Sequence, residues 1–223
     1  MAGGIGGTSL GAPSDDVDQR DEAAIADAAI GVVARQGLDR FSVRNVAREA
    51  GVAPGTVQHH YRTRAQLLDA ALARVVERQV RRVDEGGGDD SGIGALRLGL
   101  RALLPVDEPR REEAIVWIAF AAAAAATPSL ARRHRAVVEL TRQRIAYVIE
   151  LGQEQGEVPG SIDPARAAVE IAAFVDGLLV HTIGGDDSAE SIEADCDDAV
   201  TRLLGGEIAG PSAVPQSIGD VAD

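Results

Sequence analysis

The side chains of this chain that could do chemistry gather between Ser42 and Arg64, and they are hydrogen-bonding groups. An arginine can donate two hydrogen bonds to the O6 and N7 atoms of guanine, and a glutamine can pair with adenine in a similar bidentate way. Arg44 and Gln58 are of these types, and the hydroxyl of Thr56 can reach a base or a phosphate. Together they predict a surface that contacts double-stranded DNA.

Two short helices separated by a tight turn must position these side chains. Ser42 is typical of an N-cap, and Gly51 supplies the positive φ that a tight turn needs. Pro54 stands where a second helix would start, because a missing N–H costs nothing there, and Val57 and Tyr61 give that helix an inward face. The first helix has apolar residues at helical spacing, namely Val43, Val46, Ala47 and Ala50. This arrangement predicts a helix-turn-helix.

The same stretch resembles the DNA-binding signature of TetR-type repressors. The resemblance rests on residues 50–57 (AGVAPGTV), His60-Tyr61, Arg64 and the Leu67-Leu68 pair, and it covers roughly residues 20–84. The sequence departs from the usual signature at Gln58 and His59, where aromatic residues are usual, at Tyr61 for Phe, and at Arg64 for Lys. The resemblance implies a homodimer on a palindromic operator, released when a small-molecule effector binds the larger domain.

Nine residues are predicted to contact DNA. The small Pro54 and Gly55 permit close approach to the groove, whereas Ser42 and Arg64 are assigned to phosphates at the two flanks. For Arg44, base reading and a solvated or phosphate-bound arginine remain equal alternatives. The full set is Ser42, Arg44, Pro54, Gly55, Thr56, Gln58, His59, His60 and Arg64.

The adjacent histidines do not predict a metal site. Neighbours on a helix point about 100° apart, and neither Cys nor an acidic ligand lies near His59 and His60 in the sequence. We expect no metal and no cofactor.

The charge of the chain is unevenly distributed. The net charge is −13, yet residues 40–64 contain five arginines and one acid, Glu49. That window is therefore +4 and the remainder is −17. A local basic surface can dock on phosphates, and its binding should be sensitive to salt.

Composition favours an all-helical protein. Aromatic residues make up only 3% and alanine is abundant, while 223 residues suffice for a small head and a larger domain with its own core. We expect about nine helices. The first should span residues 21–36, and the fourth should be capped by Thr63 and run to the glycines at 86–88. The predicted units are a disordered arm at 1–16, a helix-turn-helix domain at 17–65, a ligand-binding and dimerisation domain at 66–204, and a disordered tail at 205–223.

The larger domain is predicted to hold the effector. With Trp117, Pro128 and the Asp176-Gly177 pair, it is similar to the C-terminal type of the choline-responsive repressor group, although the sequence does not identify the effector. Aromatic residues at helical spacing are more often part of a core than of a cavity, but the candidate pocket residues are these rings and histidines: Trp117, Phe120, His134, Tyr147, Phe174 and His181.

The last two helices are predicted to form the dimer interface. The segment 164–183 is apolar on more than one side, so it must be covered twice. The predicted interface residues are Ala165, Ala168, Val169, Ala172, Leu179, Ile192, Cys196, Val200 and Leu203.

Other classes of function fit the sequence less well. Residues 91–204 contain no nucleophile elbow, phosphate loop or metal-spaced His/Cys cluster, so we do not expect an enzyme. A single cysteine, the lack of a signal-peptide pattern and a longest apolar run of 13 residues at 114–126 predict a cytoplasmic protein without a membrane span. The alternative to a ligand-released repressor is a structural or partner-responsive DNA-binding dimer without an effector.

Overall fold

The computed structural model describes residues 13–86 and 91–205, and this part of the chain is helical, with no strand. The prediction of an all-helical fold with about nine helices is confirmed. The described helices are α1 (Pro13–Arg40), α2 (Val43–Ala50), α3 (Pro54–His60), α4 (Arg64–Glu85), α5 (Gly92–Arg101), α6 (Glu108–Ala126), α7 (Pro128–Glu154), α8 (Pro164–Thr182) and α9 (Ala189–Leu203).

The first helix is longer than the sequence predicts. It begins at Pro13 and runs to Arg40, with Gly37 in a non-helical conformation (φ 73°, ψ 173°), whereas we expected a helix over 21–36. Pro13 suits a helix start because its fixed φ is already helical. Residues 13–16 of the predicted arm are therefore helical. Residues 1–12 and 206–223, which hold the rest of the arm and all but one residue of the predicted tail, lie outside the described residues.

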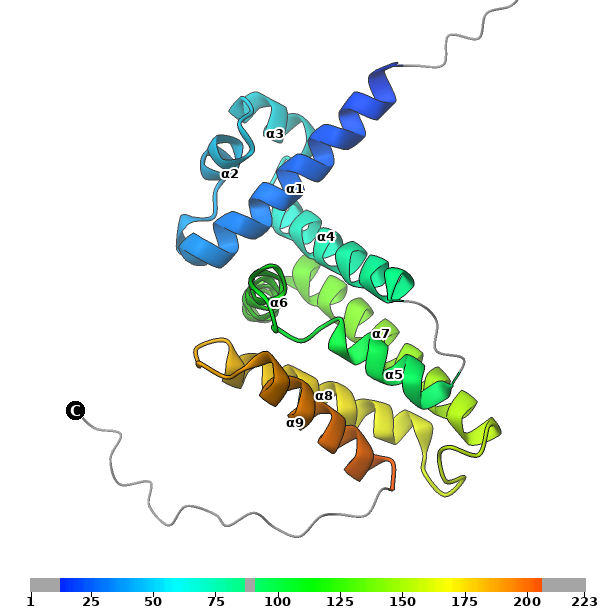
Figure 1. The fold of residues 1–223 in the computed structure, drawn as a ribbon. Helices are drawn as coiled ribbons and strands as arrows, with labels where there is room; N and C mark the ends of the chain where they lie inside the picture. The colour runs from blue at the N-terminus through cyan, green and yellow to red at the C-terminus, as the bar shows by residue number, and fades with distance from the viewer. Residues whose placement is uncertain (1–12, 87–90, 206–223) are drawn as a thin grey trace, which may run out of the picture.

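Helices α1 to α4 form the head of the molecule. α2 and α3 lie at the end farthest from α8 and α9, and α1 passes across them (Figure 1). The head is built on one apolar cluster whose fully buried members include Ile25, Val46, Val57 and Leu72. α6 completes this cluster with Val116 and Phe120, each 0% exposed.

Helices α5 to α9 form the larger domain around a second cluster. Leu104, Ile149, Ala168 and Ile171 are among its most buried members. Each of α5, α6, α8 and α9 begins at a side-chain N-cap, given by Ser91, Asp107, Asp163 and Ser188. In the described part of the chain, no helix is long and apolar enough to cross a membrane.

Helix α4 connects the two parts. Its first half, including Leu67, Leu68 and Leu72, lies in the core of the head. Its second half runs beside α5 and α7 (Figure 1). A displacement of its second half would therefore be transmitted to the head along a single continuous helix.

Candidate DNA-binding surface and candidate effector pocket

The helix-turn-helix is fixed by local hydrogen bonds at each junction. The hydroxyl oxygen of Ser42 accepts from the backbone N–H of Asn45 at 3.2 Å and so caps α2. Gly51 adopts φ 69°, and the next residue, Val52, donates its N–H to the carbonyl of Ala47 at 3.0 Å. α3 begins at Pro54 without a side-chain cap. The predicted cap, turn and helix start are confirmed.

A capping box fixes the junction between α3 and α4. The Thr63 hydroxyl accepts from the Gln66 N–H at 3.1 Å, and the Gln66 side chain accepts from the Thr63 N–H at 3.1 Å. The Arg64 guanidinium donates to the carbonyls of Leu38 at 2.5 Å and Phe41 at 3.1 Å. Arg64 therefore ties the start of α4 to the end of α1 and the beginning of α2.

The predicted DNA-contacting residues divide into two groups. Arg44, Pro54, Gly55, Gln58 and His59 are exposed, and Thr56 is half-buried in the first turn of α3. Small residues in that turn leave the backbone accessible, and a Cβ added at Gly55 would meet no atom within 4 Å.

The second group, Ser42, His60 and Arg64, is bound to other groups of the protein. The ring of His60 is only 6% exposed and lies 3.5 Å from the Glu22 carboxylate of α1. The Ser42 hydroxyl is used as a cap, and the Arg64 guanidinium is used by backbone carbonyls. These three residues position the surface, and any DNA contact they make would have to be shared with these roles.

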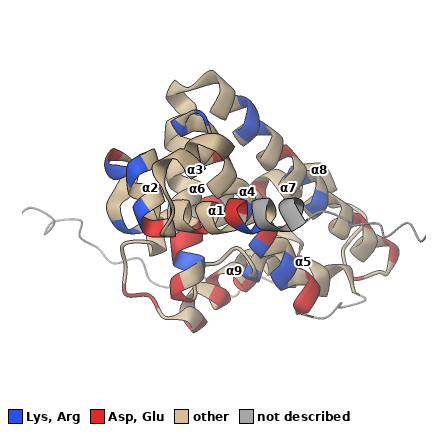
Figure 2. Ribbon diagram, turned by 90° about the horizontal axis from the view of Figure 1, so that it is seen from above, with Lys and Arg blue, Asp and Glu red and all other residues tan. Residues whose placement is uncertain are grey.

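Free positive charge lies on and beside α2. Arg40, Arg44 and Arg48 are exposed, and their guanidinium groups form no ion pair or hydrogen bond with any described residue. Glu49, the one acid among residues 40–64, is paired with Arg35 of α1 at 2.5 Å. Figure 2 shows basic residues at α2 within a surface on which both signs of charge occur.

Sequence reasoning did not single out Arg40 and Arg48. The signal was present, because Arg44 and Arg48 are four residues apart and therefore lie on the same face of α2.

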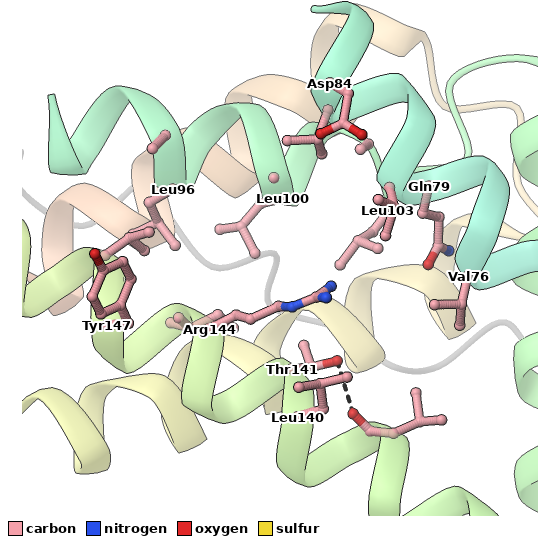
Figure 3. Close-up of a pocket in the computed structure, with 18 of the residues that line it drawn as sticks. Val76, Gln79, Asp84, Leu96, Leu100, Leu103, Leu140, Thr141, Arg144 and Tyr147 are labelled. Atoms are coloured by element: carbon pink, nitrogen blue, oxygen red, sulfur yellow. Dashed lines mark hydrogen bonds between the residues drawn. The ribbon is translucent and has the colours of Figure 1, made fainter. Parts of the chain in front are cut away.

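A pocket of about 570 Å³ opens between α4, α5 and α7 (Figure 3). Its volume is within the ordinary range of small-molecule sites. Aliphatic side chains make up most of the lining, among them Val76, Leu96, Leu100, Leu103 and Leu140. The polar and charged groups of the lining are Gln79, Asp84, Arg133, Thr141, Arg144 and Tyr147.

Of the six residues predicted for an effector pocket, only Tyr147 lines this one. Trp117 borders a separate hollow of about 40 Å³ between α5, α6, α7 and α8. Phe120 is completely buried and belongs to the core of the head. Phe174 is half-buried and His181 is exposed on α8, and neither borders a described pocket. Helical spacing placed these rings on helices correctly but could not tell a cavity wall from a core.

Trp117 links α6 to α7 and α8. Its indole N–H donates to the Asp176 carboxylate at 2.9 Å, and its ring stacks on that of His134 with centroids 5.0 Å apart. Desolvation by the surrounding side chains raises the pKa of Asp176, although the Trp117 hydrogen bond and the nearby His134 act to lower it. The aromatic face of Trp117 is thus occupied within the protein.

The predicted dimer residues fall on both sides of α8 and α9. Ala168, Leu179, Ile192, Cys196 and Val200 are buried within one chain. Ala165 and Val169 are exposed, and Ala172 and Leu203 are half-buried. The five buried residues form the domain's own core, so the surface open to a partner is the opposite face of these helices, where Val169 is 42% and Val180 56% exposed.

Cys196 is inaccessible in this arrangement. Burial raises the pKa of its thiol to about 11, with the Asp197 carboxylate adding to the effect. Within the described residues, no group of three or more His, Cys, Asp or Glu side chains is arranged to hold a metal ion.

The fold and the head define a helix-turn-helix protein with a second helical domain, and comparisons identify its family. The profile of the bacterial regulatory proteins of the tetR family matches residues 25–71, and that of the BetI-type transcriptional repressor C-terminal domain matches residues 92–205. The chain belongs to the tetR family of bacterial regulatory proteins. Such proteins are DNA-binding transcriptional regulators and not enzymes.

Individual relatives agree with this assignment. The HTH-type transcriptional regulator PksA of Bacillus subtilis is 29% identical over 162 residues, which cover 71% of this chain and 77% of PksA. The crystal structure of a transcriptional regulator from Rhodococcus sp. Rha1 is 34% identical, with a TM-score of 0.71, and the match covers 82% of this chain and 95% of that one. A TetR-family regulator from Rhodococcus sp. is 28% identical, with a TM-score of 0.76 over 84% of this chain and 100% of that one.

Proposed function

We propose that the protein is a homodimeric, sequence-specific repressor that leaves its operator when a small molecule fills the pocket between α4, α5 and α7. The observation that carries the proposal is the position of α4, which is part of the head's core at one end and of the pocket wall at the other. Family membership supports DNA binding, dimerisation and response to an effector.

For the DNA contacts, we propose that Thr56, Gln58 and His59 of α3 enter the major groove together with Arg44 of α2. The exposure of Arg44, Gln58 and His59, the half-exposed position of Thr56 and the neutralisation of Glu49 by Arg35 support this arrangement. Ser42, His60 and Arg64 hold the backbone in position, and Arg40 and Arg48 add phosphate contacts.

For the dimer, we propose that the exposed faces of α8 and α9 pair across a two-fold axis. Exposed Val169 and Val180 on α8 support this choice, since burying them against a second copy removes apolar surface from water.

For the coupling, we propose that an ion-pair network carries the displacement of α4 to its neighbours. The nearly buried Glu113 of α6 accepts hydrogen bonds from Arg82 of α4 and lies 3.6 Å from Arg78. Arg78 also pairs with Asp27 of α1 at 2.9 Å. A ligand that displaces the pocket face of α4 would change the geometry of these ion pairs. This mechanism requires the ligand to bind the DNA-bound and the DNA-free conformations with different affinities.

The test is selection of bound sequences from a random duplex library by purified protein, followed by anisotropy titrations at fixed salt. We expect a palindrome. Arg44→Ala should weaken binding to it about tenfold or more, because a bidentate base contact contributes about 1–3 kcal/mol of discrimination. Thr56→Ala should weaken binding by a smaller factor, about threefold to tenfold, since a neutral hydrogen bond contributes about 0.5–1.5 kcal/mol.

The matched control is Arg81→Ala, which removes an exposed arginine from the second half of α4, far along the chain from α2 and α3. It should leave operator affinity unchanged. If selection yields only salt-dependent binding without a preferred sequence, the repressor proposal fails and the structural or adaptor dimer gains support.

A further inference from the structure

We propose that the pocket between α4, α5 and α7 binds an anionic amphiphile, a molecule with an apolar body and one carboxylate-type group held by Arg144. This inference rests on the proposed function, because it names the chemical class of the effector for the same pocket. It extends that proposal from the existence of a ligand to the charge that the ligand must carry.

The apolar part of the ligand is inferred from exposed hydrophobic surface. Five large hydrophobic side chains of the described residues are exposed, and three of them, Val80, Leu140 and Tyr147, line this pocket. Tyr147 is 66% exposed and Leu140 is 45% exposed. Apolar surface gathered in a hollow and left in water is typical of a ligand site, because an apolar occupant would remove it from solvent.

The anionic part of the ligand is inferred from Arg144. Its guanidinium forms no hydrogen bond or ion pair with any described residue. Figure 3 shows the Arg144 side chain lying across the pocket, with its guanidinium between the walls formed by α4 and α7. A guanidinium that faces an apolar site without a partner is suited to a bidentate bond with a carboxylate.

Arg144 is the one cationic group of the described lining without a partner, whereas Gln79 and Tyr147 can offer only neutral hydrogen bonds. Arg133 is already paired with Asp69 at 3.1 Å, and the Thr141 hydroxyl donates to the Val137 carbonyl of its own helix at 3.0 Å. Asp84 has no partner among the described residues, and Figure 3 places it at the margin of the pocket. Asp84 can accept a hydrogen bond from a hydroxyl or amide of the same ligand.

A quaternary ammonium ligand fits this pocket poorly. Such cations are held by the faces of several aromatic rings, and Tyr147 is the one aromatic residue of the lining. Trp117, the best ring for this purpose, is stacked on His134 and hydrogen-bonded to Asp176 outside the pocket. The Asp84 carboxylate at the margin of the pocket would attract a cation, but the Arg144 guanidinium between the walls would repel one placed against the apolar lining.

The experiment compares three probes that share a ten-carbon chain: decanoate, decanol and decyltrimethylammonium. Each is titrated into the full-length protein by calorimetry below its critical micelle concentration. Decanoate should bind most tightly. Arg144→Leu should lower its affinity about tenfold or more, as expected for the loss of a charge-assisted hydrogen bond, and should leave decanol nearly unchanged. Arg144→Lys should restore part of the decanoate affinity.

Two further variants locate the binding and control for charge. Arg135→Leu removes an exposed arginine from α7 that does not line the pocket, and it should leave all three probes unaffected. Ala136→Trp places a large ring at an exposed lining position and should weaken all three. Circular dichroism of each variant checks that the helices are retained.

The proposal is overturned if decyltrimethylammonium binds as tightly as decanoate, if Arg144→Leu weakens the three probes equally, or if decanoate does not bind. None of these results depends on DNA, so each is distinguishable from failure of the operator selection. Conversely, decanoate binding that requires Arg144 would support the ligand class even if no operator were found.

Discussion

The head and the larger domain differ in which side chains they leave without a partner or exposed to water. In the head, apolar side chains are enclosed in one core, and the groups left without a partner among the described residues include the exposed guanidinium groups of Arg40, Arg44 and Arg48. The larger domain leaves exposed apolar side chains and the unpaired Arg144 around its pocket. A surface that binds DNA presents charge that phosphates neutralise, whereas the pocket also presents apolar surface that a ligand would remove from water. α4 takes part in both regions, and the following variants test this contrast.

The largest expected effect compares one substitution in the two regions. Leu72→Ala removes a completely buried side chain of α4 from the head's core and should reduce the free energy of unfolding by about 2–5 kcal/mol. Leu140→Ala removes a half-exposed pocket residue of α7 and should change the free energy of unfolding by only about 0.5 kcal/mol. Urea denaturation measures both, and equal losses would contradict the difference between a closed core and an open pocket.

The ion pairs around α4 provide the second comparison. Glu113→Ala removes a carboxylate that is 2% exposed and leaves Arg78 and Arg82 without it, so we expect a loss of about 3 kcal/mol. The matched variant Glu112→Ala breaks the pair with the half-exposed Arg35 and should cost less than about 1 kcal/mol. Chemical denaturation at neutral pH measures the free energy of unfolding of the two variants. An equally small loss for Glu113→Ala would mean that the network does not hold α4 to α6.

The third comparison uses two glycines of α5, the helix that forms one wall of the pocket. A Cβ at Gly92 would lie 2.3 Å from the backbone N of Gly152, so Gly92→Ala should destabilise the larger domain by about 1–3 kcal/mol. A Cβ at Gly99 would meet nothing within 4 Å, so Gly99→Ala should stabilise the helix by about 0.5–1 kcal/mol. Thermal unfolding shows whether each substitution raises or lowers the melting temperature. Shifts of the same sign for the two variants would contradict the close crossing of α5 and α7.

The smallest expected effect is a pH dependence at the head. Burial acts to raise the pKa of Asp27, but hydrogen bonds and charge from Arg74 and Arg78 outweigh it, so the net pKa lies below the usual 3.8. This carboxylate therefore contributes stability above pH 3.8, and the contribution is lost as the pH falls through its lower folded-state pKa. The difference between the urea midpoints of wild type and Asp27→Asn should be full at pH 6 and should shrink as the pH falls below 3.8. The exposed Asp39→Asn is the control, and a difference that grows as the pH falls below 3.8 would contradict the sign.

The head could be predicted closely because its geometry is set by near neighbours in the sequence. The Ser42 cap, the Gly51 turn, the Pro54 start and the Thr63 cap each act within about four residues, and all four are found in the structure. The start of α1 was predicted too late because apolar periodicity begins only after its first turns, whereas the helix itself begins at Pro13.

The pocket could not be predicted in the same way. Its walls come from α4, α5 and α7, and each side chain faces the cavity only because of how three helices cross. Aromatic residues at helical spacing were the available signal, and it found Tyr147 but also Phe120, which packs against the head. The outward faces of α8 and α9 were likewise indistinguishable from their core faces, since Cys196 and Val169 are both apolar.

The most direct test of the account is a salt series of anisotropy titrations on the selected operator and on a scrambled duplex of the same composition. We predict that the operator binds at least about 10³-fold more tightly at physiological salt. Both affinities should fall as salt rises, because the proposed contacts of Arg40 and Arg48 with phosphates release counterions, while the preference for the operator persists. Equal affinities for the two duplexes would contradict the claim that this head reads sequence.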